Sequence, residues 1–428
     1  MEKRPEIRGS CSEPCRVNEG ELITGEFTAS RNGDTLELSM NSGGRVMGAE
    51  FRIVAGEGRF SLRDVTIGVQ FHWERTEEQS FHGVLRLIRD GNGVTAINEI
   101  GLEEYLKSVI SSEMSAESPP ELLRAHAITS RSWLAAMLEQ QLKSKKLSDA
   151  RRSHESPGEL LRWYDREDHA LFNVCADDHC QRYQGVSRIV SAEAERAVDA
   201  TRGICLTYAN DICDARFSKA CGGLSENFEN AWDDVAVPYL RSISDSPDSF
   251  SPVNQEKDAQ AWIMSRPQAY CNVKNKEILE TILPSLDLET ADFFRWQVLY
   301  GQTELSELIR KKSDLDFGLI LDLIPVQRGP SGRIVRLQIV GSKRTLVVGK
   351  ELEIRKWLSP SHLYSSAFVV SKTPSGEQVP TSFILHGAGW GHGVGLCQIG
   401  AAAMAMEGKQ AKDILLHYFR GAELKKVY

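Results

Sequence analysis

Residues 100–133 read IGLEEYLKSVISSEMSAESPPELLRAHAITSRSW, and this stretch predicts the fold of the middle of the chain. The spacing of Leu102, Leu106 and Val109 at i, i+4 and i+7 is typical of a short helix with one apolar face. A second helix is predicted to begin with an N-cap residue, a first-turn proline and the acidic partner of a capping box, at Ser118, Pro119 and Glu121. Glu113 therefore falls in the short joint between the two helices.

The position of Glu113 allows two interpretations. A carboxylate in a joint between helices is commonly a solvated loop residue or a helix cap. Alternatively, Ile110 and Met114 on either side would shield the carboxyl group from water, an environment that suits general acid/base catalysis. The position alone leaves both interpretations open.

The chain before this stretch is β-rich. Residues 84–88 and 94–97 are mostly apolar and flank the sequence DGNG at residues 90–93, which is typical of a hairpin turn. After residue 100, helices and strands follow one another without regular βαβ alternation. The sequence therefore predicts an α+β fold.

The same patterns suggest how the chain is divided. We expect an N-terminal β-rich region at residues 1–97 and a second domain at residues 98–428. Within the second domain, residues 149–185 are polar and irregular. Residues 256–315 are charged and predicted to form a mostly helical insertion.

Composition excludes some classes of function. The chain has 428 residues, with 41% hydrophobic and 26% charged residues, as is usual for globular proteins. A net charge of −8 argues against a nucleic-acid partner, and no stretch reaches the roughly 20 apolar residues of a transmembrane helix. The first 25 residues contain no signal-peptide core, so we expect either a cytosolic protein or an exported one whose signal is missing from this chain.

The sequence HALFNVCADDHC at residues 169–180 gathers metal-ligating side chains. The chain has nine cysteines, an odd and scattered set that does not indicate a disulfide framework. Thiolate and imidazole groups are the ligands that tetrahedral Zn²⁺ prefers, and four protein ligands close a structural site. The alternative is a polar loop with a buried cysteine. The candidate ligands are His169, Cys175, His179 and Cys180.

Two further motifs offer polar side chains beside glycines. In SKACGGLSEN, residues 218–227, the Gly222-Gly223 pair permits a close approach of ligand to backbone, although a turn between strands is the simpler interpretation. Cys221 could act as a nucleophile with a distant histidine, but no cysteine-protease signature surrounds it. In HGAGWGHGVGLCQIGA, residues 386–401, the glycines alternate and do not form GxGxxG, which argues against a nucleotide loop. Such a run would suit either a flat ligand such as a sugar or tight packing on a helix.

These motifs together resemble one family, the stage II sporulation protein D and amidase enhancer family (SpoIID/LytB). The resemblance rests on the stretch quoted first, on residues 213–245 (CDARFSKACGGLSENFENAWDDVAVPYLRSISD), on residues 389–421 (GWGHGVGLCQIGAAAMAMEGKQAKDILLHYFRG) and on the loop at residues 169–183 (HALFNVCADDHCQRY). It covers most of residues 98–245 and 330–428, and poorly covers the N-terminal region and the segment 256–315.

The resemblance implies an enzyme of the cell wall. Sporulation members are peptidoglycan lytic transglycosylases, which cleave the MurNAc–GlcNAc bond of peptide-stripped glycan strands and leave a 1,6-anhydro-MurNAc end. It implies that Glu113 is the general acid/base, in a fold with β-sheet lobes and helices around a glycan-binding cleft. The residues expected to bind the glycan are Ser218, Cys221, Gly222, Gly223, Trp390 and His392.

The family loop also implies a structural Zn²⁺ on His169, Cys175, His179 and Cys180, with both cysteines as thiolates. Members usually carry Ser or Thr where this chain has Cys221. A cell-wall activity implies a periplasmic or extracellular location.

Other functions remain open from the sequence. One is a non-catalytic enhancer that binds a cell-wall amidase as its partner, as some relatives do. Another is a module that binds glycan strands without cutting them, and a third is a zinc hydrolase, for which no open ligand set is visible.

Overall fold

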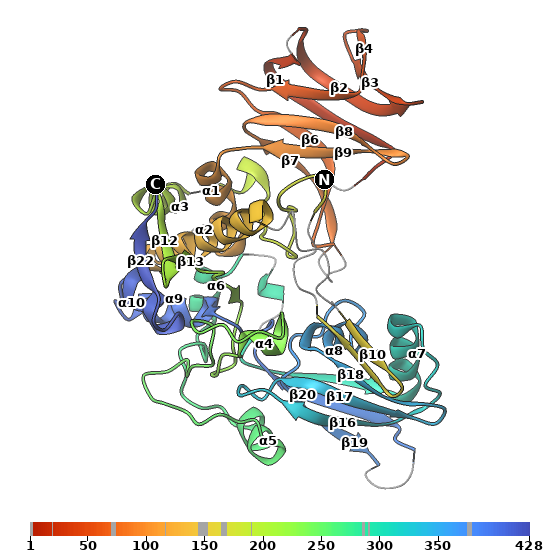
Figure 1. The fold of residues 1–428 in the computed structure, drawn as a ribbon, viewed down its shortest axis with the longest axis vertical. Coiled ribbons are helices and arrows are strands. Elements are labelled where there is room, and N and C mark those ends of the chain that lie inside the picture. Colours follow the sequence, from red (N-terminus) through yellow and green to blue (C-terminus); the bar gives the residue numbers. More distant parts are fainter. Residues whose placement is uncertain are drawn as a thin grey trace. The chain divides into compact units, whose positions relative to one another are not determined.

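The computed structural model describes residues 3–428 except 19, 70–73, 116, 144–152, 164–168, 190, 285–286, 290–291 and 375–378. Its helices and separate sheets confirm the predicted α+β class (Figure 1). The chain forms two compact units, residues 1–117 with 169–202 and residues 118–168 with 203–428. The first unit thus continues past residue 97. The domain boundary that the sequence suggested between residues 97 and 98 stays a prediction. None of the described helices is both long and apolar enough to cross a membrane.

A nine-stranded antiparallel sheet makes up most of the first unit. Buried and exposed residues alternate along its strands, so the apolar side chains gather on one side, as the period of a strand requires. The strand order is β4-β3-β2-β1-β5-β8-β9, and β6 pairs with β1 and β7. The strands are β1 (Glu6–Val17), β2 (Leu22–Asn32), β3 (Thr35–Met40), β4 (Arg45–Gly48), β5 (Glu50–Val54), β6 (Phe60–Ile67), β7 (Arg75–Phe81), β8 (Val84–Asp90) and β9 (Gly93–Glu99). The predicted hairpin is confirmed as β8–β9, which closes where Asp90 pairs with Gly93.

The described residues of the first unit also form three short helices: α1 (Leu102–Glu113), η1 (Gly185–Arg188) and α3 (Ala192–Ala200). The predicted apolar stripe of α1 is confirmed, with Leu106 and Val109 fully buried. The prediction for Glu113 was wrong in detail, because this residue is the last of α1 and does not lie in the joint. The helix continues as far as Glu113 because Ile110 and Met114 are also fully buried. The N–H of Met114 donates the last hydrogen bond of the helix to Ile110 O.

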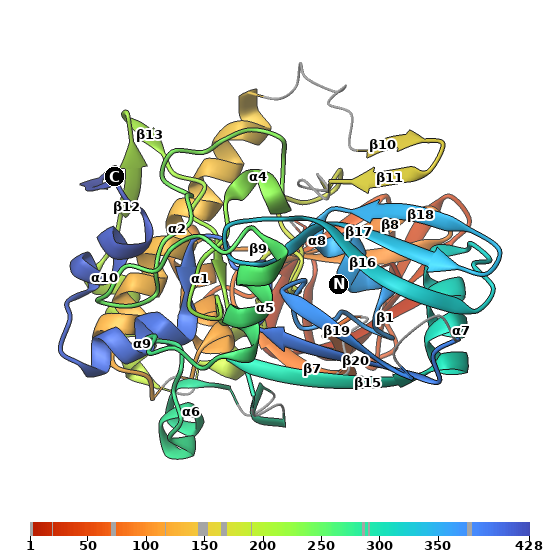
Figure 2. The same ribbon diagram turned by 90° about the horizontal axis from the view of Figure 1, so that it is seen from below.

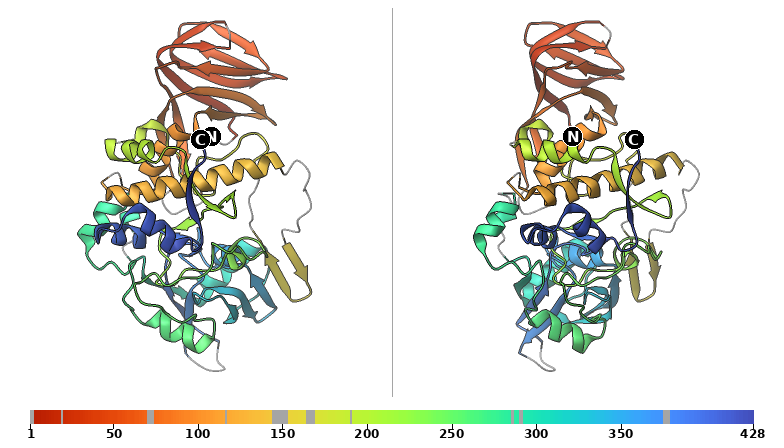
Figure 3. Two further views of the ribbon diagram at one scale, coloured as in Figure 1. Left: turned by 60° about the vertical axis from the view of Figure 1, so that its left-hand side comes forward. Right: turned by 90° about the vertical axis from the view of Figure 1, so that its left-hand side faces the viewer.

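The second unit is built on the long helix α2 (Pro120–Lys143), which packs against α9 (Gln398–Met406) and α10 (Ala411–Tyr418) (Figure 3). The predicted capping box at its start was wrong. Glu121 accepts a hydrogen bond from Ala411 N at 2.9 Å, at the first turn of α10, so its carboxylate links two helices. The Ser118 hydroxyl donates a hydrogen bond to Ile282 O at 3.4 Å.

Two sheets of the second unit share one core. One has the order β10-β11-β18-β17-β16 and the other β15-β20-β19. Figure 2 shows α7 and α8 beside the first of them. The elements are β10 (Ser153–Ser156), β11 (Glu159–Arg162), β15 (Arg295–Gly301), α7 (Gln302–Ser313), β16 (Ile320–Arg328), β17 (Ile334–Gly341), β18 (Thr345–Gly349), α8 (Glu351–Trp357), β19 (Phe368–Thr373) and β20 (Ser382–Ala388).

The remaining elements of this unit are short. They are β12 (Ile204–Tyr208), β13 (Asp211–Ile212), β14 (Phe217–Ser218), α4 (Phe228–Ala231), α5 (Glu256–Met264), α6 (Lys276–Ile282), η2 (Asp287–Glu289), β21 (Leu396–Cys397) and β22 (Glu423–Lys426). The segment 256–315 is therefore not all helical, because β15 pairs with β20 over its whole length. The segment 149–185 likewise contains a hairpin, β10–β11, and its residues 149–152 and 164–168 lie outside the described residues.

Candidate functional site

Glu113 ends α1 with its carboxylate directed at backbone of the same unit. The side chain is buried, with 7% of the residue exposed, and Oε1 accepts the N–H of Arg182 at 3.1 Å. A buried carboxylate oxygen needs such a donor, because leaving it unpaired costs free energy. The helix end and residues 181–184 therefore hold each other in place.

The rest of α1 is fixed on the same segment. Tyr105 Oη lies 3.4 Å from Gln181 Oε1, and Gln184 N donates to Ser108 Oγ at 3.1 Å. The rings of Tyr105 and Tyr183 stack with centroids 5.0 Å apart. These contacts leave Glu113 little freedom to move away from Arg182.

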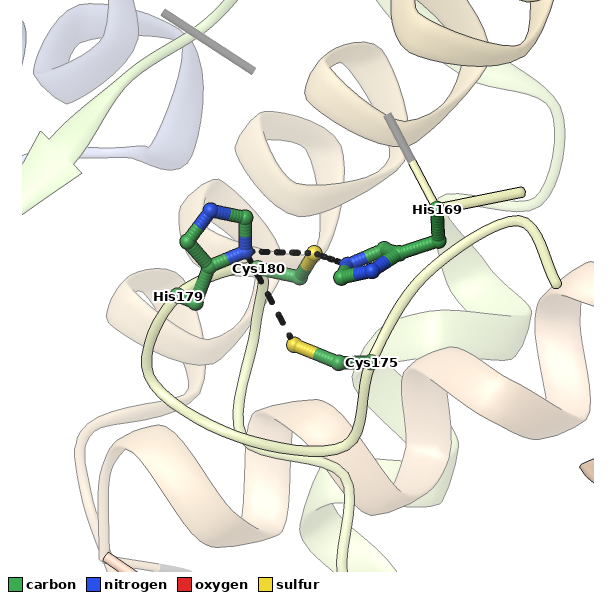
Figure 4. Close-up of side chains that lie close together, drawn as sticks. All are labelled: His169, Cys175, His179 and Cys180. Atoms are coloured by element: carbon green, nitrogen blue, oxygen red, sulfur yellow. Dashed lines mark hydrogen bonds between the residues drawn. The ribbon is translucent and has the colours of Figure 1, made fainter. Parts of the chain in front are cut away.

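The four predicted metal ligands come together just before this segment (Figure 4). Their ligand atoms all lie within 4.8 Å of one another. His169 Nε2 is 3.4 Å from Cys180 Sγ, and His179 Nδ1 is 3.5 Å from Cys180 Sγ and 3.9 Å from Cys175 Sγ. No disulfide joins the cysteines of the described chain.

This geometry fits a tetrahedral metal ion. Ligands at the usual Zn–S and Zn–N distances are separated by about 3.3–3.8 Å along the edges of the tetrahedron. The three distances between ligand atoms given above lie in or close to that range. The hydrogen bond with Cys180 lowers the pKa of Cys175 to about 3 despite burial, which favours the thiolate that binds metal.

The metal-ligand loop is connected both to the sheet and to Glu113. Its Asp177 carboxylate accepts the N–H groups of Gly68 and Val69 at 3.1 and 2.8 Å. Asp178 pairs with Arg182 Nε at 2.6 Å, and the backbone N–H of that same arginine holds Glu113. The loop thus places the donor that fixes the carboxylate.

The other predicted site residues all belong to the second unit, where the two glycine-containing motifs run side by side. Strand β14 pairs with β21 in parallel, and Ala220 and Trp390 exchange backbone hydrogen bonds at 3.1 and 2.7 Å. Glu226 N donates to Gly393 O at 2.8 Å. The sequence separation of these motifs is large, so this pairing could not be read from either motif alone.

Trp390 and His392 are partly exposed in this paired region. The Trp390 ring stacks on Tyr364, with centroids 4.4 Å apart, and tilts against Phe293. His392 packs edge-on against Trp232 and accepts the N–H of Val394 at Nδ1. Although the residue is partly exposed, its imidazole is largely removed from water, and this desolvation together with nearby arginines lowers its pKa well below the usual range, so it is neutral.

The predicted site residues of the middle motif, the stretch at residues 213–245 quoted above, are more buried than their predicted role suggests. Ser218 is 6% exposed, and its Oγ has no hydrogen-bond partner among the described residues. Cys221 is 2% exposed, and its sulfur lies 3.7 Å from that of Cys271. Gly222 lies against the backbone of Gly389 and Gly223 against the Trp262 ring. Their predicted contact with glycan stays a prediction.

The sequence patterns did not indicate Arg333, which braces both motifs together with Glu226 of SKACGGLSEN. Arg333 is 1% exposed and donates to Cys221 O at 3.1 Å and to Gly391 O at 3.1 Å. The same guanidinium reaches Ser331 Oγ, which donates to the buried Glu226 carboxylate. A buried charge is tolerated only with such partners. The acidic residue within SKACGGLSEN was visible in the sequence, but its distant arginine was not.

This bracing explains part of the alternating glycine run. Gly393 has φ +74°, and a Cβ there would lie 2.3 Å from Arg333 Cζ. The structure therefore supports tight packing for this glycine, because the guanidinium of the protein itself occupies the space.

Gly393→Ala is expected to lower the free energy of unfolding by about 2–5 kcal/mol, from left-handed strain and from overpacking. Gly408→Ala is the matched control, because Gly408 has φ +86° and nothing within 4 Å of the added Cβ. It should show only the strain, about 1–2 kcal/mol. Urea denaturation measures both, and equal losses in the two variants would contradict the packing explanation.

His126 is a further residue that the sequence patterns did not indicate. It is fully buried in α2, its ring lies edge-on to Phe217 at 4.8 Å, and its Nε2 is 2.9 Å from the Gln398 amide. Burial, and to a lesser extent the charge of Lys219, lower its pKa from 6.5 to about 3. The imidazole is therefore neutral in the folded protein.

Stability should consequently fall as the pH is lowered. Between pH 6.5 and about 3 the unfolded histidine takes up a proton that the folded one does not, so the free energy of unfolding decreases. The slope from this residue is at most about 1.4 kcal/mol per pH unit. His392 acts in the same direction, so the comparison that isolates His126 is with His126→Gln. Urea titrations at several pH values should give a shallower slope for the variant, and an unchanged slope would refute this assignment.

The fold and these contacts define a class of protein: an α+β chain with a buried glutamate at a helix end, braced by a His/Cys loop. Comparisons with known proteins agree with the earlier resemblance. A family model described as "Stage II sporulation protein" matches residues 90–208, and one described as "Domain of unknown function (DUF8618)" matches residues 226–395.

Individual relatives point the same way. Stage II sporulation protein D of Bacillus subtilis is 27% identical over 334 residues, 77% of this chain and 76% of that protein. An uncharacterized protein of Brachyspira hyodysenteriae is 26% identical over 80% of this chain and 72% of its own length. The amidase enhancer of Bacillus subtilis is 24% identical over 55% of this chain, but only 33% of that protein is covered.

These matches support the stage II sporulation protein D and amidase enhancer family for this chain. The same matches support a cell-wall-related function. The first family match contains α1, Glu113 and the metal-ligand loop.

Proposed function

We propose that this protein is a peptidoglycan lytic transglycosylase with Glu113 as its single general acid/base. The observation that carries the proposal is the fixed placement of this carboxylate at the end of α1 by the Arg182 N–H. General acid/base catalysis needs a carboxyl group held in a defined position, because proton transfer depends on distance and direction. The substrate is a glycan strand from which the stem peptides have been removed.

One carboxyl group suffices for the reaction. Protonated Glu113 gives its proton to the glycosidic oxygen as the bond from that oxygen to C1 of MurNAc breaks. The resulting carboxylate then takes the proton from the O6 hydroxyl of MurNAc, and O6 bonds to C1. A hydrolase needs a second carboxylate to act as nucleophile or to activate water, whereas here O6 replaces the water.

The second unit supplies side chains of the kind that bind sugars. Trp390, stacked on Tyr364, presents an aromatic surface, and Ser218 has an uncommitted hydroxyl. We assign to these residues and to His392 a role in glycan binding. Cys221, Gly222 and Gly223 support that region through their packing.

The metal-ligand loop is assigned a structural Zn²⁺. Two thiolates and two imidazoles would complete a tetrahedral site, which leaves no position for a catalytic water. When bound, the ion would cross-link the loop and would take no part in the reaction itself. The chain itself then does the positioning, through Asp178, Arg182 and the carboxylate of Glu113.

A second candidate function is a non-catalytic enhancer of a cell-wall amidase. It is favoured by the match to a protein of that name and by the burial of Glu113, since a buried carboxylate bonded to backbone can have a purely structural role. Both functions place the protein in the periplasm or outside the cell.

The two functions differ in what the protein does alone. We expect the native protein to shorten purified, peptide-free glycan strands without any amidase. Chromatography of the fragments measures this shortening. Strands that stay intact, together with faster release of stem peptides when an amidase is added to whole peptidoglycan, would instead establish the enhancer.

A further inference from the structure

We propose that Cys221, Asp245, Cys271 and Cys397 form a second metal site, a closed tetrahedral site for a thiophilic divalent cation such as Zn²⁺. The four ligand atoms lie within 4.8 Å of one another. The site belongs to the second unit and shares no residue with the His/Cys loop of the first unit.

Four separate segments of the chain converge on this point. Cys221 lies in the middle motif and Asp245 at its end, Cys271 lies between α5 and α6, and Cys397 precedes α9. All four residues are at most 2% exposed. Cysteines packed only as apolar residues need not bring their sulfur atoms together around a carboxylate, so the convergence itself indicates a ligand set.

Charge gives an independent argument. Asp245 is fully buried and has no ion-pair partner among the described residues. A carboxylate in such a place is costly unless a cation neutralises it. Three thiols beside it offer soft ligands, and Zn²⁺ accepts three sulfurs and one oxygen in a tetrahedron. The separation of Cys221 Sγ and Cys271 Sγ, 3.7 Å, equals an edge of about 3.7 Å expected for two zinc-bound sulfurs.

The surroundings hold these ligands in position. Asp245 Oδ1 accepts the Tyr418 hydroxyl at 2.6 Å and Oδ2 accepts the Cys271 N–H at 2.9 Å, so each oxygen keeps a lone pair for a cation. The N–H of Cys221 donates to Cys397 Sγ at 3.2 Å. Such outer hydrogen bonds are typical of metal centres.

A glycine makes room for the carboxylate. A Cβ at Gly400, in the first turn of α9, would lie 2.3 Å from Asp245 Oδ1. A cation at this point would tie the middle motif to the start of α9. It would also give Cys221 a role that a serine or threonine would fill poorly, because thiolate is the better ligand for Zn²⁺.

The metal content of the full chain tests the proposal. Mass spectrometry of the purified, natively folded protein is expected to find two zinc ions per chain, and Cys271→Ser to retain only one. Cys213→Ser is the control, because this buried cysteine belongs to neither cluster, and it should retain both ions. Circular dichroism checks that each variant is folded.

A second measurement does not depend on the folding of Cys271→Ser. Reconstituting the metal-free chain with Co²⁺ should give a stronger thiolate-to-cobalt absorption band in the native sequence than in Asp245→Asn. One zinc ion in the native chain and one in Cys271→Ser would overturn the proposal. An intact mass that reveals a Cys221–Cys271 disulfide would also overturn it, since a disulfide uses two of the ligands.

Discussion

Glu113→Gln is expected to lower the rate of glycan cleavage by about 10²–10⁴-fold, the usual contribution of a general acid/base. The substitution removes the proton that the reaction needs and keeps an amide oxygen to accept the Arg182 N–H. The melting temperature and the affinity for glycan strands should therefore change little. Initial rates with peptide-free strands, strand pull-down and a thermal melt measure these three quantities on the same preparation.

Two further variants separate catalysis from structure. Glu117→Gln is the matched control, because Glu117 is an exposed carboxylate only four residues away, and it should keep full activity. Glu113→Ala leaves the Arg182 N–H without its acceptor and is expected to cost about 1–3 kcal/mol of stability. A fully active Glu113→Gln protein combined with an unstable Glu113→Ala protein would show that the residue is only structural.

Cys175→Ser is expected to remove the loop metal and, with it, most of the activity. Structural zinc binding is worth about 10–16 kcal/mol in small zinc domains, so its loss has a large effect on the segment that the metal holds. This segment carries Asp178 and Arg182, which position Glu113. We expect one metal ion fewer per chain, faster proteolysis of the first unit and a rate reduced by at least about tenfold, as is usual when a positioning shell is disturbed.

Leu171→Ala provides the control for that experiment. Leu171 lies in the same loop, is 43% exposed and is not a ligand, so the variant should keep its metal and its activity. Chelation of the native protein should reproduce the cysteine variant, and added Zn²⁺ should restore it. If Cys175→Ser loses the metal and yet cleaves glycan at the native rate, the loop does not position Glu113.

Features encoded by neighbouring residues were predictable from the sequence. The apolar stripe of α1, the β8–β9 hairpin and the clustering of His169 with Cys175, His179 and Cys180 depend on residues that lie close together in the chain. Local spacing decides a helix face, a two-residue turn and a twelve-residue loop.

Features that depend on distant segments were not predictable in the same way. Arg333 reaches Cys221 O across more than one hundred residues, and Asp245 meets Cys397 only after the fold has formed. The end of α1 at Glu113 and the use of Glu121 to hold α10 are likewise set by tertiary burial and contacts, which override local capping signals.

The most direct test is the chemical nature of the cleaved ends. Peptide-free glycan strands would be incubated with the native protein and with Glu113→Gln, and the fragments analysed by mass spectrometry. We predict fragments that end in 1,6-anhydro-MurNAc, lighter by one water than hydrolysis products, from the native protein and none above background from the variant. Fragments with ordinary reducing ends, or uncut strands with a folded and strand-binding native protein, would contradict the transglycosylase assignment.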